Sequence, residues 1–310
     1  MWLRLRPGFT VAGQRRSRAS ERGEWPSALY KNLNDLGFQG SVYPVNPRRD
    51  EIWDVTCYAD FASLPEPVDL ALVVIPGGAV LNVLEEGTAH GLKSAVVFAA
   101  NMGEGDDPEV VARGRALTEL CERTGLRACG PNCMGIVSAH NKVFAYPNEA
   151  MCRMPAGNVA AVFQSGGAMM YWADAAAARG IRFSHMITSG NELDLVLADY
   201  VDYLIDDPGT DIIVLMIEAI RRPDAFMQAA ARALASKAPQ TAQSVALAGF
   251  LCNDAFREVS AQAIQLHGGI AYTQEHVAHL YWRRARATLS MFGDSDLHRE
   301  AYLSAWEAAA

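Results

Sequence analysis

Four Gly- or Pro-rich segments follow apolar runs in the first half of the chain, and they hold most of the residues that could bind a ligand there. Glycine lets backbone N–H groups approach a ligand closely, and an arginine guanidinium binds phosphate. One such segment is usually only a turn, but four at successive strand ends indicate a binding site. The segments are Asn46 to Arg49, Pro76 to Gly78, Asn101 to Gly105 and Gly130 to Gly135.

A second group of candidate residues lies further along the chain. Gln164, Ser165, Gly166 and Gly167 come just before a helical pattern, so their N–H groups and the helix dipole predict an anion site. The alternative is an ordinary strand-to-helix turn in which Ser165 only caps the helix. Glu218 ends an apolar strand, where a carboxylate is costly unless it has a partner.

Alternating strand and helix patterns must position these segments. Short β-branched runs at 41–45, 69–75 and 94–98, with helical spacing at 79–90 and 108–124, predict a doubly wound α/β domain over residues 1–147. A Pro-containing stretch at 146–155 interrupts the pattern. The alternation then restarts and predicts a second α/β domain over 155–238, with strands at 158–163, 183–188 and 211–217 and helices at 168–179, 195–205 and 224–236. Past Pro239 only helical spacing remains, through Val245 to Ala263 and beyond, so residues 239–310 are expected to be all-α.

Composition limits the function classes. Of the 310 residues 50% are apolar, enough for a large core, and the 27 Lys and Arg against 35 Asp and Glu give a net charge of −8. That charge argues against a nucleic-acid or anionic-membrane surface as the main function. The apolar runs fall far short of the roughly 20 residues that span a bilayer. The six cysteines form no C-x-x-C pair, which indicates reduced thiols in a cytoplasmic protein and no zinc site.

The motif order resembles a known family. Val-Tyr-Pro-Val-Asn-Pro at 42–47 and Gly-Pro-Asn-Cys-Met-Gly at 130–135 are similar to the CoA-binding domain of NDP-forming acyl-CoA synthetases, which include the succinyl-CoA synthetase alpha subunit. The resemblance continues through 157–167 and Thr188 to Glu192 and covers about 24–238. It implies a Rossmann-like CoA-binding domain followed by a flavodoxin-like α/β domain.

The resemblance also implies roles for individual residues. Asn46 and Arg48 would lie near the adenosine and phosphates of CoA, and Pro76 near the pantetheine. The loop that begins at Gly130 would meet the thiol end through Asn132 and Cys133, although Cys133 could equally be a small buried filler. Gln164, Ser165 and Gly166 would bind in the second domain, and Glu218 would position a phosphohistidine.

The chain departs from that family in three places. No phosphohistidine segment follows Lys237, and no ATP-grasp domain is present to supply nucleotide. At the start, Phe9 to Ala12 could replace the family's first strand, and Arg15 and Arg16 could replace its phosphate loop or simply form a solvated segment. The ligase reaction is therefore expected to need a partner, such as an ATP-grasp subunit.

The end of the chain resembles a different family. Residues 254–286 are similar to the C-terminal helical bundle of acyl-CoA dehydrogenases, over about 238–303. There Gln265, Gly268 and Gly269 match a loop that meets the FAD of a neighbouring subunit. The position of that family's catalytic base falls on Gly293, with Asp294 adjacent, so oxidation by this chain alone is not expected.

Three histidines in the same segment invite a metal-site interpretation. His276 and His279 share a helical face, and His267 lies upstream. Nothing in their pattern fixes a site, so surface or core histidines are the preferred interpretation and no metal is expected.

Three hypotheses follow. The first is a CoA or acyl-CoA binding protein derived from an acid–CoA ligase, which acts as an oligomer with a partner subunit. The second is an acyl-CoA dehydrogenase component that completes a FAD site. The third is an inactive fusion or truncation product.

Overall fold

The computed structural model describes residues 9–13, 24–235, 254, 257–258, 260–273, 276–292 and 294–309. The chain divides after residue 233 into two compact units. The first holds two β-sheets with their helices, and the second is helical. Arg15, Arg16, Gly293 and the stretch from Val245 to Asn253 lie outside the described residues.

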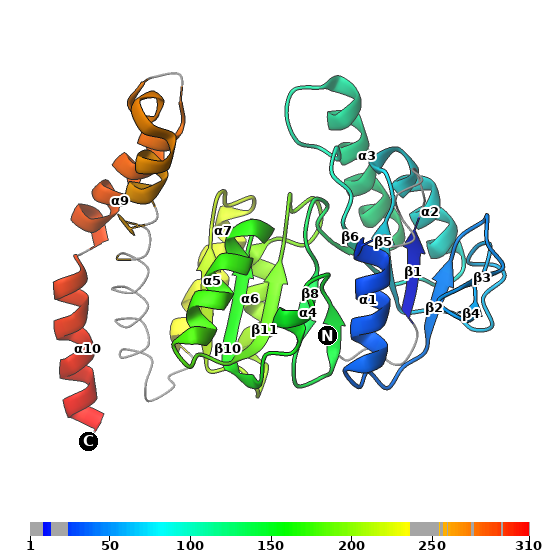
Figure 1. Ribbon diagram of the computed structural model, residues 1–310, viewed down its shortest axis with the longest axis horizontal. Coiled ribbons are helices and arrows are strands. Elements are labelled where there is room, and N and C mark those ends of the chain that lie inside the picture. Colours follow the sequence, from blue (N-terminus) through cyan, green and yellow to red (C-terminus); the bar gives the residue numbers. More distant parts are fainter. Residues whose placement is uncertain are drawn as a thin grey trace. The chain divides into compact units, whose positions relative to one another are not determined.

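The first sheet is parallel throughout, and helices pack against it (Figure 1). Its strand order is β2-β1-β5-β6-β7. The central strands are buried runs of Val, Leu and Ala, as expected for strands covered on both faces. The strands of this sheet are β1 (Phe9–Gly13), β2 (Val42–Val45), β5 (Leu70–Val74), β6 (Ser94–Val97) and β7 (Arg127–Cys129). The helices are α1 (Glu24–Asp35), α2 (Gly77–Ala89) and α3 (Pro108–Thr124). Two further short strands, β3 (Glu51–Ile52) and β4 (Val55–Thr56), pair with each other as a separate hairpin.

Helix α3 illustrates how local sequence sets the element bounds. The Asp107 side chain accepts a hydrogen bond from the Glu109 N–H at 2.9 Å, and Pro108 occupies the first turn. The helix ends at Gly125, whose φ of +75° is in the left-handed region. These signals reproduce the predicted bounds at 108–124.

The second sheet has the order β12-β10-β11-β8-β9. Its three longest strands are parallel, and β8 pairs antiparallel with β11. The strands are β8 (Ile136–Ser138), β9 (Val143–Ala145), β10 (Ala156–Phe163), β11 (Phe183–Thr188) and β12 (Ile212–Met216), and the helices are α4 (Glu149–Cys152), α5 (Gly166–Ala178), α6 (Leu197–Ile205) and α7 (Pro223–Ala235).

Strands β8 and β9 differ from the sequence-based expectation. Residues up to 147 were assigned to the first domain, but Ile136 pairs with Ile187 and Ser138 with His185 of the second sheet. The buried side chains of these short strands complete the core beside β11. The first sheet therefore ends at β7, and the loop at 130–135 connects the two sheets.

One apolar cluster spans both sheets. It contains Leu70 and Val96 from the first sheet and Ala160 and Ile187 from the second, all buried. Leu29 of α1 belongs to the same cluster. A polar contact adds to this link, because the buried Asn32 Nδ2 donates to the Tyr146 carbonyl at 2.8 Å.

A buried polar network joins strands β8 and β11 of the second sheet. His185 is fully buried on β11, with Nε2 3.0 Å from Ser138 Oγ and Nδ1 3.6 Å from Asp207 Oδ2. Asn141 Nδ2 donates to Ser138 Oγ, so the Ser138 hydroxyl can donate to Nε2 of a neutral imidazole. Burial lowers the pKa of His185 to about 4, against an opposing effect of Asp207.

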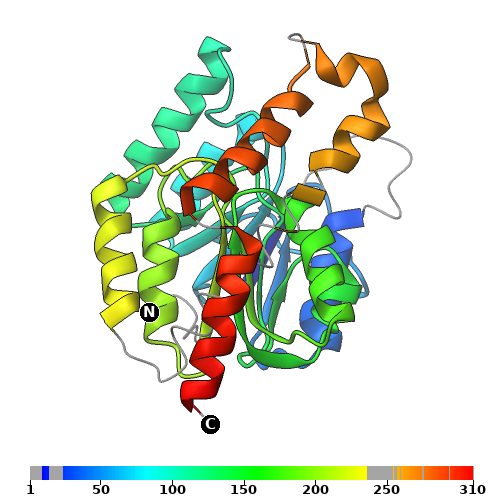
Figure 2. The ribbon, with the colours of Figure 1, turned by 90° about the vertical axis from the view of Figure 1, so that its left-hand side faces the viewer.

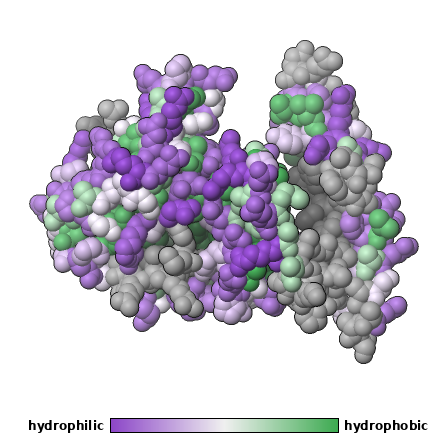
Figure 3. Space-filling view, turned by 180° about the vertical axis from the view of Figure 1, so that it is seen from behind, coloured by the Kyte–Doolittle hydropathy of each residue, from purple (hydrophilic) through white to green (hydrophobic). Residues whose placement is uncertain are grey.

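The second unit consists of helices. Residues 260–267 are helical and continue into the 3-10 turn η2 (Gly268–Tyr272), and α9 (Ala278–Phe292) and α10 (Ser295–Ala309) follow (Figure 2). The all-α expectation for this segment is thus confirmed for its described part. Apolar side chains lie among hydrophilic ones on its surface (Figure 3), and the large exposed ones are Leu266, Ile270, Val277, Leu280, Tyr281, Leu297, Leu303 and Trp306.

Within the residues that the structure describes, no helix combines the length and the hydrophobicity that a membrane span requires. The five described cysteines, Cys57, Cys121, Cys129, Cys133 and Cys152, are buried free thiols.

Candidate functional site

A cavity of about 340 Å³ lies where loops from the carboxyl ends of both sheets meet. In parallel sheets these ends are the usual position of ligand sites. Seven of the residues singled out as candidates by sequence line it: Asn132, Cys133, Gln164, Ser165, Gly166, Gly167 and Glu218. The other lining residues are Trp25, Phe98, Met134, Gly190 and Asn191.

The loop after β7 supplies one wall of the cavity. A Cβ on Gly130 would lie 2.5 Å from the Val97 carbonyl oxygen, so only glycine lets the loop pass this close to β6. Asn132 adopts a left-handed φ of +58°, and its side chain is exposed. Its N–H donates to the Ala99 carbonyl at 2.9 Å. The loop thus presents Asn132 to the cavity from a fixed backbone.

Cys133 lies on the buried side of that loop. Its Sγ is 3.4 Å from the Val97 carbonyl oxygen. The neighbouring Cys129 thiol and burial raise the pKa of the Cys133 thiol well above its usual value. Its burial and its contact with the Val97 carbonyl favour the filler interpretation of this residue.

The loop after β11 packs tightly onto the loop after β7. A Cβ on Gly190, whose φ is +61°, would lie 2.1 Å from the Pro131 carbonyl oxygen. Asn191 N–H donates to that same oxygen at 2.9 Å, and Asn191 Nδ2 donates to Glu104 Oε2 at 2.8 Å. Glu104 also accepts from the Met102 N–H. Three loops from two sheets are therefore tied together at the cavity.

Gln164 positions the loop that carries Glu218. Its Oε1 accepts from the N–H groups of Glu218 at 2.6 Å and Ala219 at 2.8 Å, and its Nε2 donates to the Ala219 carbonyl at 2.6 Å. Gln164 itself is buried. Its polar atoms are thus committed to the backbone, so its contribution to a ligand site is indirect.

Glu218 is exposed, contrary to the expected burial at a strand end. The reason is that β12 ends at Met216, so Glu218 already belongs to the loop that follows. Its side chain therefore needs no buried partner, and it lines the cavity.

Helix α5 begins at the cavity. Ser165 caps it, with Oγ accepting from the Ala168 N–H at 3.3 Å. Ser165 therefore caps the helix, as the alternative interpretation of this segment predicts. A Cβ on Gly166 would meet the Met134 side chain at 2.4 Å, whereas nothing lies within 4 Å of one on Gly167. The first turn of α5 is thus open to an anion at Gly167, where the helix dipole favours negative charge.

Glu192 is buried directly after Asn191. Its Oε1 accepts from Ser189 Oγ at 2.7 Å, and its Oε2 has no hydrogen-bond partner among the described residues. Burial raises the pKa of the carboxyl, and the Ser189 hydroxyl partly offsets this.

Sequence reasoning missed two aromatic residues that line the cavity, Trp25 and Phe98. Trp25 is on the first turn of α1, and Phe98 directly follows β6. Their ring centroids are 6.0 Å apart in an edge-to-face arrangement. Phe98 could have been identified as the last residue of a predicted strand, but no local motif marks Trp25.

The remaining first-domain candidates lie at other strand ends and not in this cavity. Asn46 and Arg48 follow β2, and Pro76 follows β5, which are the two neighbours of β1. Asn46 Oδ1 accepts from the Arg48 N–H at 3.0 Å, and the Arg48 side chain is exposed. Pro76 is the exposed N-cap residue of α2, followed by Gly77 and Gly78. These residues flank the point where the strand order reverses, which is where open α/β sheets bind nucleotides.

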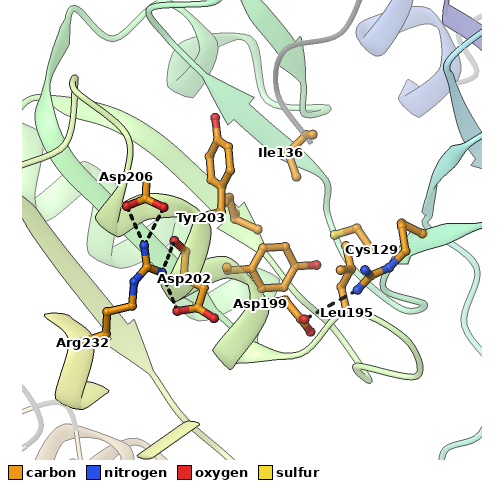
Figure 4. Close-up of a pocket in the computed structure, with 11 residues that line it drawn as sticks. Cys129, Ile136, Leu195, Asp199, Asp202, Tyr203, Asp206 and Arg232 are labelled. Atoms are coloured by element: carbon orange, nitrogen blue, oxygen red, sulfur yellow. Dashed lines mark hydrogen bonds and ion pairs between the residues drawn. The ribbon is translucent and has the colours of Figure 1, made fainter. Parts of the chain in front are cut away.

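A second cavity, of about 330 Å³, holds none of the predicted site residues (Figure 4). Asp199 and Asp202 of α6 and Asp206, which directly follows this helix, line it. Arg232 Nη1 lies 2.8 Å from Asp202, and Arg232 Nη2 lies 2.6 Å from Asp206. Because these ion pairs are satisfied internally and carboxylates predominate, this cavity does not suit the phosphates of CoA.

In the helical unit, Gln265, Gly268 and Gly269 are all exposed. Gly268 begins η2 with a φ of +64°, and nothing lies within 4 Å of a Cβ on either glycine. A ligand could therefore approach the backbone closely here.

The other candidates in this unit have structural roles or no cluster. Asp294 accepts from the Leu297 N–H at 2.9 Å and so caps α10. The rings of His267 and His276 are 4.5 Å apart, and the described residues hold no group of three metal-ligating side chains.

Three family models match the chain. A CoA binding domain matches residues 17–139, and a succinyl-CoA ligase like flavodoxin domain matches 156–240. An acyl-CoA dehydrogenase C-terminal domain matches 214–305.

Curated relatives agree with this division. An ADP-forming acetate–CoA ligase of Methanocaldococcus jannaschii is 35% identical over 212 residues, which are 68% of this chain and 29% of that protein. The alpha subunit of ADP-forming acetate–CoA ligase II of Pyrococcus furiosus is 34% identical over 67% of this chain and 45% of its own length. An acyl-CoA dehydrogenase of Mycolicibacterium smegmatis is 38% identical over 76 residues, 24% of each chain. The chain thus spans less than half of each of these relatives.

Solved structures support the fold. A crystal structure of a Pyrococcus horikoshii protein has a TM-score of 0.67 and 31% identity, over 74% of this chain and 51% of that one. A dinucleotide-forming acetyl-coenzyme A synthetase of Candidatus Korarchaeum cryptofilum has a TM-score of 0.65 and 28% identity, over 74% of this chain and 48% of that one. Residues 17–240 are therefore similar to the CoA-binding and succinyl-CoA-ligase-like parts of NDP-forming acyl-CoA synthetases, and the acyl-CoA dehydrogenase C-terminal match overlaps and follows them.

Proposed function

We propose that the chain binds CoA or an acyl-CoA and acts as the CoA-binding component of an acid–CoA ligase. The observation that carries this is the convergence of the loop after β7, the start of α5 and Glu218 on one cavity between the two sheets. The CoA-binding family match over 17–139 supports it.

Each group of residues has a distinct part in this proposal. Asn46, Arg48 and Pro76 flank the strand-order reversal and would hold the nucleotide half of CoA, with Arg48 supplying charge for phosphate. The Gly130 loop would direct the thiol to the cavity at Asn132. Because Cys133 is neutral and buried, the sulfur that forms the thioester is that of CoA. As this bond forms, the acyl–oxygen bond to phosphate breaks, the thiol proton is lost and phosphate leaves.

The start of α5 and Glu218 would act on the phosphate side of the reaction. The open space beside Gly167 and the dipole of α5 favour the leaving phosphate. Glu218, held through its backbone by Gln164, would orient the group that carries the phosphoryl. Formation of the acyl phosphate itself would fall to a partner chain with an ATP-grasp domain.

Calorimetric titration of CoA into the purified chain tests the proposal. We expect saturable binding, weakened about tenfold by Arg48→Ala because a charge-assisted hydrogen bond is lost. Arg115→Ala, which removes an exposed arginine on α3, is the matched control. Absence of heat with wild type at millimolar CoA would refute the proposal.

A second assay addresses the need for a partner. The chain alone, supplied with a carboxylic acid, CoA, Mg²⁺ and nucleoside triphosphate, should form no thioester. Thioester formation by the purified chain would contradict this part of the proposal.

A second candidate function rests on the helical unit. We propose it only because the acyl-CoA dehydrogenase C-terminal match at 214–305 coincides with the open glycine pair Gly268 and Gly269. These residues, with Gln265, could contact the FAD of a dehydrogenase subunit. Co-purification with such a subunit, together with the visible absorbance of bound flavin, would support this function. A co-expressed preparation that is colourless would refute it.

A further inference from the structure

Two asparagine side chains contact each other in the lining of the cavity where the loops of the two sheets meet. Asn132 comes from the loop after β7, and Asn191 comes from the loop after β11. Asn132 Nδ2 donates a hydrogen bond to Asn191 Oδ1 at 3.4 Å. Because an amide group has one donor end and one acceptor end, the direction of this contact decides which end of Asn132 is left for a ligand.

The orientation of the Asn191 amide follows from its other partners. Asn191 Nδ2 donates to Glu104 Oε2 at 2.8 Å and to the Met102 carbonyl oxygen at 3.2 Å. A carboxylate and a carbonyl accept hydrogen bonds but do not donate them. A reversed amide would place its own oxygen against both of these oxygen atoms. The Asn191 oxygen therefore has to be the end that meets Asn132.

Glu104 holds this arrangement although it does not itself line the cavity. Its Oε1 accepts from the Asn101 N–H, and its Oε2 accepts from the Met102 N–H at 2.7 Å. The Asn191 amide is a further donor to the same carboxylate. The loop after β6 thus fixes Glu104, and Glu104 in turn fixes the Asn191 side chain.

The Asn132 amide is oriented by the same reasoning. Because Asn191 Oδ1 is an acceptor, Nδ2 must be the end of Asn132 that faces it. The backbone is also fixed, since the Asn132 N–H donates to the Ala99 carbonyl at 2.9 Å. Within the part of the chain that the structure describes, no group donates to Asn132 Oδ1. The side chain is exposed and lines the cavity, so this oxygen can accept a hydrogen bond from a ligand.

We propose that Asn132 Oδ1 accepts a hydrogen bond from the thiol of CoA, so that the cavity receives CoA as the free thiol. Asn191 and Glu104 are positioning residues that act through Asn132. This inference rests on the proposed function, because the nucleotide half of CoA must bind for the thiol to reach the cavity. A thiol carries a weak S–H donor, whereas a thioester sulfur carries none, so the contact distinguishes CoA from its acylated form.

Calorimetric titration of the full chain with CoA and with desulfo-CoA, in which hydrogen replaces the thiol, tests this. At about pH 7 an ordinary thiol is mostly protonated and can donate. We expect CoA to bind about threefold more tightly than desulfo-CoA, as one hydrogen bond from a weak donor provides. Asn132→Ala should bring the ratio of the two affinities to about one. Asn132→Asp, which keeps an acceptor oxygen and tolerates the left-handed φ, should retain the preference.

Two variants test the positioning residues. Asn191→Ala removes the acceptor that orients Asn132, and Glu104→Gln puts an amide NH2 group where a donor now meets an oxygen. Both should move the ratio of affinities toward one, whereas a merely structural role would weaken both ligands equally. Asn158→Ala is the matched control, since it removes an exposed amide that donates to Asp211 Oδ2 at 2.8 Å near the start of β10. It should leave the ratio unchanged.

The outcomes separate this inference from the proposed function. Equal wild-type affinities for CoA and desulfo-CoA would overturn the inference and leave the proposed function standing. A preference that survives both Asn191→Ala and Glu104→Gln would overturn the positioning roles. If neither ligand binds to the wild-type chain, both proposals fail. Saturable binding of desulfo-CoA verifies that each variant is folded, and if one variant does not fold the other decides.

Discussion

The buried imidazole of His185 predicts that the first unit loses stability in mild acid. The pKa of His185 falls from 6.5 to about 4 in the folded protein, chiefly because of burial, with Asp207 opposing and the exposed His140 adding slightly. Between these two values the unfolded chain binds a proton that the folded chain does not. The free energy of unfolding is therefore fully maintained above about pH 6.5 and declines as the pH falls toward 4.

The size of the effect follows from the pKa difference. Each pKa unit corresponds to about 1.4 kcal/mol, so this single group should lower the free energy of unfolding by roughly 2 to 3 kcal/mol between pH 7.5 and 4.5. Carboxylates titrate in the same range, so the wild-type decline alone does not identify His185.

The decisive measurement compares variants. Urea unfolding of wild type and His185→Gln at both pH values should show that the variant is less stable at pH 7.5, because the contacts to Ser138 and Thr210 change. Its further loss on acidification should be smaller than that of wild type by the same 2 to 3 kcal/mol. His90→Gln, on an exposed helix end, is the matched control. Equal acid-induced losses in wild type and His185→Gln would refute the assignment.

Three further perturbations test the loops and caps. Gly190→Ala should destabilise the first unit by several kcal/mol, because the new Cβ would lie 2.1 Å from the Pro131 carbonyl oxygen. Gly180 also has a positive φ but open space around it, so Gly180→Ala should cost only about 1 kcal/mol. Equal losses of stability in thermal unfolding of the two variants would argue against the tight loop contact. Gln164→Ala should lower the free energy of unfolding by about 1 to 3 kcal/mol, because two N–H groups and a carbonyl lose their hydrogen-bond partner. Amide hydrogen exchange at Glu218 and Ala219 should become faster, and unaltered exchange would contradict the positioning role. Asp107→Ala should cost about 1 kcal/mol in urea unfolding through loss of the α3 cap, and Asp106→Ala beside it should have little effect.

Much of the first unit could be predicted from sequence because its signals are local. The buried runs at 69–75 and 94–98, and the Pro108 start of α3, identify their elements without knowledge of the rest of the chain. Strands β8 and β9 could not be found in this way, since each has three residues and pairs through contacts distant in sequence, such as Ser138 with His185. Their membership of the second sheet depends on that pairing and not on their own composition.

The candidate site was predictable in part for the same reason. Glycine-rich strand ends identified Asn132, Ser165 and Gly166, which line one cavity in the structure. Sequence could not reveal that the Gln164 side chain bonds to the backbone or that Trp25 lines the cavity, because both depend on how loops from two sheets come together.

The apolar cluster that spans both sheets has a consequence for folding. Leu29, Val96 and Ile187 share one buried core although they belong to regions that match two separate family models. Neither region can therefore unfold without exposing apolar surface of the other. The two regions within residues 24–235 should therefore melt in a single calorimetric transition, as one cooperative unit.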